Sequence, residues 1–106
     1  MKSAGIASCN NQIVLAVIID KSVHIYRLKT LNEVKDVLNT SKPEIVGVDK
    51  SAADLYEDLE YGFNTVKFES SIKDLSEPLK KLTMLNIAKD SDKPAIAAAY
   101  YTAEDR

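Results

Sequence analysis

The sequence has few cysteines, histidines, glycines and prolines, and these shortages exclude several classes of protein. Its 106 residues include one cysteine, one histidine, three glycines and three prolines. The lone Cys9 cannot form an internal disulfide, whereas secreted domains of this size usually have several. One histidine without a cysteine cluster cannot form a zinc site of the usual type. The three glycines form no glycine-rich loop, which argues against a P-loop or a dinucleotide-binding motif.

The chain also lacks a basic excess and a long apolar run. Its 14 lysines and arginines stand against 16 aspartates and glutamates, so the strong positive charge of a nucleic-acid coat protein is missing. The longest apolar run, Ile13–Ile19, has seven residues, whereas a membrane span needs about twenty. The first residues do not have the pattern of a signal peptide. Together with the single cysteine, these features predict a cytoplasmic protein without a membrane segment.

The composition that is present is that of a globular protein. Hydrophobic residues make up 45 % of the chain and charged residues 28 %, which is typical of folded domains. No repeat, low-complexity tract or linker divides the sequence. We therefore expect residues 1–106 to fold as one domain around one core.

The first 28 residues predict three strands joined by two tight turns. The strands cover residues 4–9, 12–19 and 22–28. Asn10 and Asn11 suit the first turn, because asparagine tolerates the positive φ of a hairpin. The middle strand is apolar on both faces, which predicts a central strand covered on both sides.

From residue 30 onward the pattern predicts alternating helices and strands. Thr30 and Glu33 form a capping box at the start of the first of these helices. Ser51 is the expected cap of the second. Strands are expected at residues 44–49 and 63–69, and later helices after Ser76 and over 95–103.

This order of elements predicts an α/β fold, with a mixed five-stranded sheet and helices on both of its faces. A right-handed crossover through the first helix places the strand at 44–49 beside the strand at 4–9. The two strands are then parallel neighbours, and the strand order in the sheet is 3-2-1-4-5.

The element order and three short motifs resemble the ribonuclease-H-like superfamily, which includes ribonuclease H, Holliday-junction resolvases and transposase cores. Gly5-Ile6-Ala7 resembles a first strand that reads Gly-Ile-Asp in resolvase-type members. The segment 45–49 resembles the fourth strand with its terminal acid. The segment 94–99 resembles a closing helix that begins Asp-Ala-Leu-Ala in those members. The resemblance implies the ribonuclease-H-like fold over nearly the whole chain.

The resemblance also implies a two-metal nuclease site, and this chain departs from it. Members of the superfamily hold two divalent ions such as Mg²⁺ with carboxylates from strand 1, strand 4 and the last helix. Asp49 matches the acid of strand 4, but Ala7 and Pro94 occupy the other two positions. Asp92 or Asp90 could replace the last acid only after a shift in register. These departures predict that the nuclease chemistry is absent or much altered.

Two functions follow from this comparison of positions. The first is a degenerate, non-catalytic ribonuclease-H-like domain that binds a nucleic acid or a protein. The second is a small Mg²⁺-dependent nuclease in which Asp49 binds the metal and Asp49 and Asp92 are catalytic.

Polar residues near the predicted strand ends suggest where a ligand would bind. Ligands of open α/β sheets lie beyond the carboxyl ends of the strands. An ammonium and a helix N-terminus there suit a phosphate. The simpler interpretation is that Asp49 and Ser51 cap the helix and that Lys50 is solvated. The expected binding residues are Ser8, Asn10, Lys50 and Ser51.

The last predicted helix has two interpretations. The segment 95–101 is small, apolar and aromatic. It either packs on the sheet as the final layer of the fold or leaves one side exposed to form a homodimer, since tyrosine is favoured at interfaces.

Overall fold

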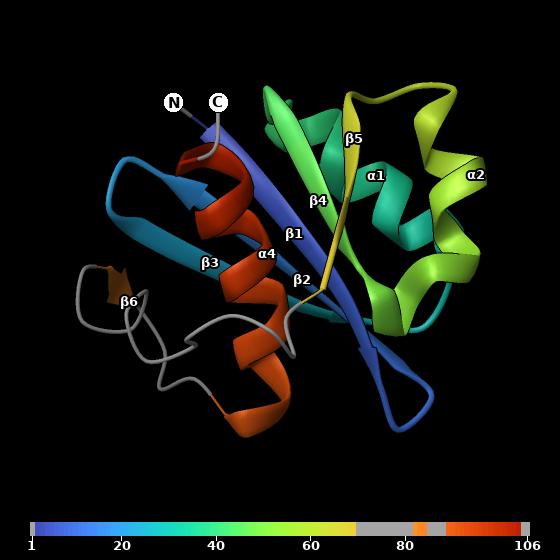
Figure 1. The fold of residues 1–106 in the computed structure, drawn as a ribbon, viewed down its shortest axis with the longest axis horizontal. Helices are drawn as coiled ribbons and strands as arrows, with labels where there is room; N and C mark the ends of the chain where they lie inside the picture. Colours follow the sequence, from blue (N-terminus) through green and yellow to red (C-terminus); the bar gives the residue numbers. More distant parts are fainter. Residues whose placement is uncertain (1, 70–81, 85–88, 105–106) are drawn as a thin grey trace.

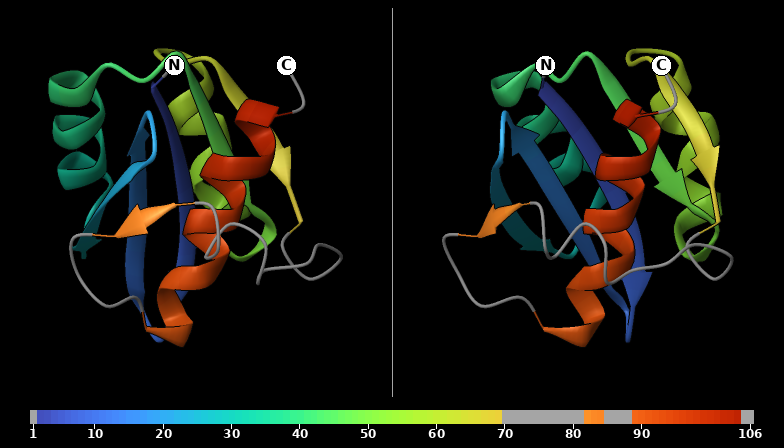
Figure 2. Two further views of the ribbon diagram at one scale, coloured as in Figure 1. Left: turned by 90° about the vertical axis from the view of Figure 1, so that its left-hand side faces the viewer. Right: turned by 60° about the vertical axis from the view of Figure 1, so that its left-hand side comes forward.

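The computed structural model describes residues 2–69, 82–84 and 89–104, in which one mixed sheet has helices on both faces (Figures 1 and 2). Its strands are β1 (Lys2–Cys9), β2 (Gln12–Ile19), β3 (Ser22–Leu28), β4 (Ile45–Asp49), β5 (Thr65–Phe68) and β6 (Thr83–Met84). The α-helices are α1 (Leu31–Ser41), α2 (Tyr56–Glu60) and α4 (Lys93–Glu104), and the 3₁₀ helices are η1 (Lys50–Leu55) and η3 (Asp90–Asp92). None of these helices is long and apolar enough to cross a membrane.

The strand order is β5-β4-β1-β2-β3-β6, which confirms the predicted order of the first five strands. β1 pairs antiparallel with β2 and parallel with β4, and Gly5 lies opposite Gly47 in the parallel pair. The sixth strand was not predicted. It is two residues long and lies parallel to Ser22–Val23 at the start of β3.

The turn between β1 and β2 has the backbone that its asparagines predict. Asn10 and Asn11 have φ values of 51° and 62°. Asp20, in the turn to β3, has a φ of 57°. These residue types tolerate the left-handed region better than others, so the local sequence favours both turns.

Alternate residues of β2 enter two different cores, which confirms that this strand is covered on both sides. One set packs with α1, η1 and α2 on one face of the sheet, and the other packs with α4 on the opposite face. The first set is Ile13, Leu15 and Val17, and the second is Val14, Ala16 and Ile18.

Helix α4 lies unusually close to the sheet because two glycines leave room for its backbone. A Cβ atom on Gly5 would overlap the Ala95 carbonyl oxygen, and one on Gly47 would lie 2.7 Å from the Ala98 carbonyl oxygen. Residues 95–100 are each at most 9 % exposed, as expected for a helix that packs on the sheet. This packing leaves little of the helix for a second subunit, and the homodimer stays a prediction.

The local sequence predicts the N-cap of α1 correctly but not the N-cap of η1. The capping box at α1 is confirmed, because the Glu33 N–H donates to Thr30 Oγ1 at 3.2 Å and the Thr30 hydroxyl donates to Glu33 Oε1 at 3.1 Å. At the next helix, the expected cap, Ser51, was two residues late. The chain enters η1 directly from β4, and Asp49 is its N-cap.

The helix expected after Ser76 falls mainly outside the described residues. Where it can be compared, at residues 82–84, the prediction is wrong, since Thr83–Met84 form β6. The leucine spacing there suggested a helix, but β3 presents an open edge whose backbone groups accept a strand. Leu82 packs against the core between the sheet and α4.

Candidate functional site

An open cavity of about 830 Å³ lies where β1 and β4 end. The two strands are parallel, so their carboxyl ends meet at one edge of the sheet. β5 runs parallel to β4 and ends at the same edge, and η3 and the start of α4 form another wall. This strand-end cavity is lined by Ser8, Cys9, Asn10, Asp49, Lys50, Ser51, Glu69, Asp90, Ser91 and Pro94.

All four predicted binding residues and Asp49 line the strand-end cavity. Hydrogen bonds among three of these residues tie the ends of β1 and β4 together. The Ser8 N–H donates to Ser51 Oγ at 3.0 Å, and the Ser51 hydroxyl donates to Asp49 Oδ2 at 2.6 Å. The Ser51 N–H donates to the same carboxylate oxygen at 3.1 Å. The network holds the floor of the cavity in one arrangement.

Asp49 has a structural role in this network. It is only 4 % exposed, and its side chain caps η1 by accepting from the Ser51 N–H. A cap of this kind stabilises a helix start by about 1 kcal/mol. The simpler interpretation of Asp49 as a cap is confirmed, whereas Ser51 acts as the hydrogen-bond partner of that cap.

Lys50 is solvated at the rim of the cavity and pairs with a residue that the sequence analysis did not place in the site. Its Nζ lies 3.6 Å from Glu69 Oε1, and its side chain is 78 % exposed. An exposed pair of this kind contributes only about 0–1 kcal/mol. Glu69 could have been predicted from the sequence. It directly follows β5, and because β5 is parallel to β4, the two strands end at the same edge of the sheet.

Asp92, expected to be catalytic, does not line the strand-end cavity. Its side chain is fully buried, and its Oδ2 lies 2.5 Å from Arg27 on β3. The same oxygen accepts from the Lys89 N–H at 2.9 Å. The turn of η3 directs Asp92 into the protein and places Asp90 in the cavity wall. Of the two acids considered near the last helix, Asp90 is therefore the one beside Asp49.

Asp90 has a lowered pKa because it pairs with Lys93. The Lys93 ammonium lies 2.8 Å from Asp90 Oδ1, and this hydrogen bond and the attraction between the charges lower the pKa of Asp90. Replacing Lys93 with methionine is expected to raise this pKa toward its ordinary value of 3.8. An NMR titration of the Asp90 carboxyl carbon measures the change, and Lys89→Met is the matched control.

The direction of this effect on stability follows from the lowered pKa. The pair stabilises the fold above the ordinary pKa, and that contribution is lost as the pH falls through the lowered value. Because the Asp90 side chain is 96 % exposed, solvent screens most of the interaction. An unchanged Asp90 titration in Lys93→Met would contradict the assigned cause.

The residues that the structure describes do not fit a pair of catalytic metal ions. At the strand 1 position the side chain of Ala7 is buried in the core against α4, and at the last helix Pro94 lines the cavity without a charge. Within residues 2–69, 82–84 and 89–104, no three histidine, cysteine or acidic side chains are grouped closely enough to hold a metal ion. Two-metal chemistry needs several carboxylates at one point.

Comparison with known proteins shows the fold. The sequence matches no protein-family model and no curated protein. The structure is similar to that of RuvC from T. thermophilus, determined in complex with a Holliday junction substrate. The TM-score is 0.69 at 18 % sequence identity, over 97 % of this chain and 92 % of the RuvC chain. The chain therefore has the ribonuclease-H-like fold, as its element order predicted.

Proposed function

We propose that this chain is a non-catalytic domain of ribonuclease-H-like fold that binds a nucleic-acid or protein partner at the strand-end cavity. The observation that carries the proposal is the buried Ala7, which stands where the resemblance implies a metal-binding aspartate. The one acid that matches, Asp49, is already engaged in capping η1. A cavity that has polar lining groups but not the expected metal ligands is suited to binding rather than to hydrolysis.

The charge of the cavity bears on the type of partner. Its lining includes the carboxylates of Asp49, Glu69 and Asp90 and one ammonium, that of Lys50. Lys50 pairs with Glu69 and Lys93 with Asp90, so the remaining charge of the cavity is small and negative. A negative charge attracts cationic side chains and repels phosphates, which favours a protein partner that presents a lysine or arginine. The Holliday junction bound by RuvC supports a branched nucleic acid as the other partner to test.

The poor fit of the described residues to a metal site gives a direct test. Addition of Mg²⁺ or Mn²⁺ at about 5 mM is expected to change the melting temperature by less than about 1 °C, because a ligand stabilises a protein only where it binds the folded state. Asp49→Asn is expected to leave that response unchanged, as is the control Asp54→Asn on the exposed side of η1. Differential scanning calorimetry measures the melting temperature.

The alternative is a Mg²⁺-dependent nuclease with an altered site, built on Asp49 and Asp90. The observation that favours it is that both acids line one cavity. A metal-dependent rise in melting temperature that disappears in Asp49→Asn but not in Asp54→Asn would support this alternative and overturn the first. Metal-dependent cleavage of a four-way junction, lost in the same variant, would do so as well.

A further inference from the structure

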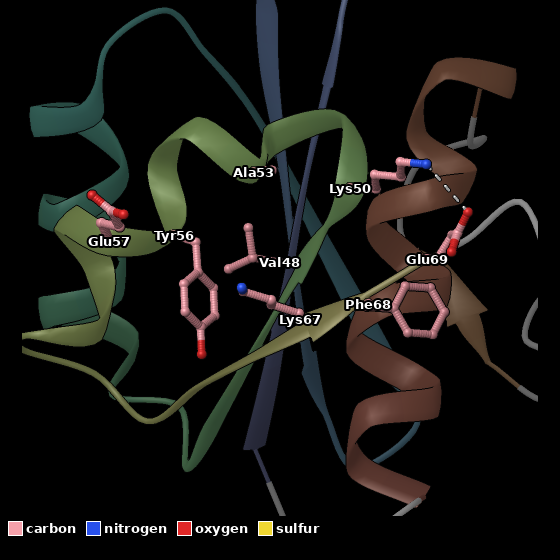
Figure 3. Close-up of a pocket in the computed structure, with 8 residues that line it drawn as sticks. All are labelled: Val48, Lys50, Ala53, Tyr56, Glu57, Lys67, Phe68 and Glu69. Atoms are coloured by element: carbon pink, nitrogen blue, oxygen red, sulfur yellow. Dashed lines mark ion pairs between the residues drawn. The ribbon is translucent and has the colours of Figure 1, made fainter.

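A second cavity, of about 430 Å³, adjoins the strand-end cavity and shares Lys50 and Glu69 with it; its lining is drawn in Figure 3. It is enclosed by β4 and β5 on one side and by η1 and α2 on the other. Its volume falls in the lower part of the range for small-molecule sites, about 300–1,000 Å³. This β5 cavity is lined by Val48, Lys50, Ala53, Tyr56, Glu57, Lys67, Phe68 and Glu69.

The β5 cavity has an apolar floor and one fixed aromatic wall. Val48 and Ala53 contribute aliphatic surface. The Tyr56 ring is held from both ends, since its backbone is in α2 and its hydroxyl donates to the Thr65 carbonyl oxygen of β5 at 3.3 Å. The Phe68 ring stacks on Tyr101 of α4, with centroids 6.1 Å apart, so it is already engaged outside the cavity. A fixed tyrosine beside aliphatic groups suits a flat ring in the ligand.

Lys67 adds a positive charge that no carboxylate of the described residues neutralises. Its Nζ lies 5.1 Å from the centroid of the Tyr56 ring, and Figure 3 shows the ammonium between that ring and Val48. The attraction between an ammonium and a ring is modest at an exposed site and uses none of the three N–H donors. Lys67 is thereby oriented into the cavity with its donors left for an anionic oxygen.

The β5 cavity also has two carboxylates, those of Glu57 and Glu69, and neither lies directly beside the Lys67 ammonium. Lys50 and Glu69 pair with each other at 3.6 Å. Glu57 is exposed, and in the view of Figure 3 it lies beyond Tyr56 from Lys67. An anion bound at Lys67 would therefore feel Glu57 as a weak repulsion at the rim.

From this juxtaposition we propose that the β5 cavity binds a nucleotide, with the base against Tyr56 and the aliphatic floor and the phosphate on Lys67. The nucleotide is either free or part of a single strand, since both present the same ring and phosphate. A bare phosphate would leave the apolar wall in water, and an uncharged ring would leave Lys67 without a partner. The two cavities share Lys50 and Glu69, but Tyr56 and Lys67 line only the β5 cavity, and the proposal does not depend on the function proposed for the strand-end cavity.

The test is an NMR titration of the ¹⁵N-labelled full chain with adenosine monophosphate. Saturable shifts are expected at the amides of Tyr56 and Lys67, with a Kd on the order of 1 mM. Adenosine and inorganic phosphate, each lacking half of the ligand, are expected to bind more weakly. Lys67→Gln is expected to weaken binding about tenfold because a charge-assisted hydrogen bond is lost. Lys67→Arg keeps the charge and is expected to stay within about threefold of the parent.

Glu57→Gln provides a control in which the affinity for adenosine monophosphate is expected to rise instead of fall. Removing the rim carboxylate is expected to tighten binding about twofold, whereas a general loss of structure would weaken it. Absence of saturable shifts, or equal affinity of Lys67→Gln and the parent, overturns the proposal. Shifts confined to Ser8, Asn10 and Asp49 overturn it too, and would support the strand-end cavity as the binding site instead.

A short single-stranded oligonucleotide distinguishes the two sources of the nucleotide. If it shifts the same amides and is displaced by adenosine monophosphate, the cavity takes a nucleotide within a strand. If adenosine monophosphate shifts them and the oligonucleotide does not, the cavity takes a free nucleotide. Binding of the oligonucleotide that is indifferent to both Lys67→Gln and adenosine monophosphate overturns the proposal.

Discussion

Replacing Gly5 with alanine is expected to lower the free energy of unfolding by about 3 kcal/mol, because the added methyl group has no room beneath α4. A Cβ atom at this position would overlap the Ala95 carbonyl oxygen and the Ala99 nitrogen. Both atoms belong to the helix backbone, so no change of rotamer relieves the overlap and α4 must move away from β1. Urea unfolding followed by circular dichroism measures the loss.

Two further substitutions make this prediction specific. Gly62→Ala adds the same methyl group where no atom lies within 4 Å, and its effect is expected to stay within about 0.5 kcal/mol. Gly47→Ala is expected to cost about 2 kcal/mol, since its first overlap is with the Thr102 hydroxyl, which is less rigid than backbone. Adding Thr102→Ala is expected to recover part of that loss. Equal stability of the Gly5→Ala and Gly62→Ala variants would show that α4 does not depend on the glycine.

Replacing Arg27 with methionine is expected to destabilise the fold by about 3 kcal/mol, because it leaves the carboxylate of Asp92 buried without its cation. Asp92 is fully buried, and among the described residues its Oδ1 already has no hydrogen-bond partner. The Arg27 side chain is 31 % exposed, so removing it does not open a large cavity. Urea unfolding at neutral pH measures the change in stability.

A double-mutant cycle separates the ion pair from other effects of the substitution. Asp92→Asn removes the charge that needs Arg27, so Arg27→Met is expected to cost much less in that background than in the parent. The expected coupling is about 2 kcal/mol. Additive effects of the two substitutions would show that the pair does not anchor η3 to β3.

The sheet could be predicted because its signals are local and agree with one another. The alternation in β2 indicated two covered faces, and Asn10 and Asn11 indicated a turn that requires positive φ. A three-strand meander followed by a crossover then leaves few topologies. What could not be predicted is the pairing of Thr83–Met84 with β3, because a two-residue strand has almost no pattern of its own and depends on an edge far away in sequence.

The candidate site was predicted where it follows from strand ends and missed where it depends on helix geometry. Ser8, Asn10 and Asp49 lie at or just beyond the carboxyl ends of parallel strands, so the topology alone brings them together. Asp90 and Asp92 are about two thirds of a turn apart in this 3₁₀ helix, and only the start of η3 decides which of them enters the cavity and which meets Arg27. Because capping shifts of one residue are common, that choice lies below the precision of sequence patterns.

The two glycines beneath α4 also set how a partner meets the strand-end cavity. They fix the height of the helix above β1 and β4, and the same helix carries Pro94 and the adjoining Asp90 in the cavity wall. The wall is thus placed by backbone contacts rather than by adjustable side chains. We therefore expect this chain to change little when a partner binds at this cavity. Any loss of conformational entropy on binding should come from the partner, because the cavity wall is already fixed.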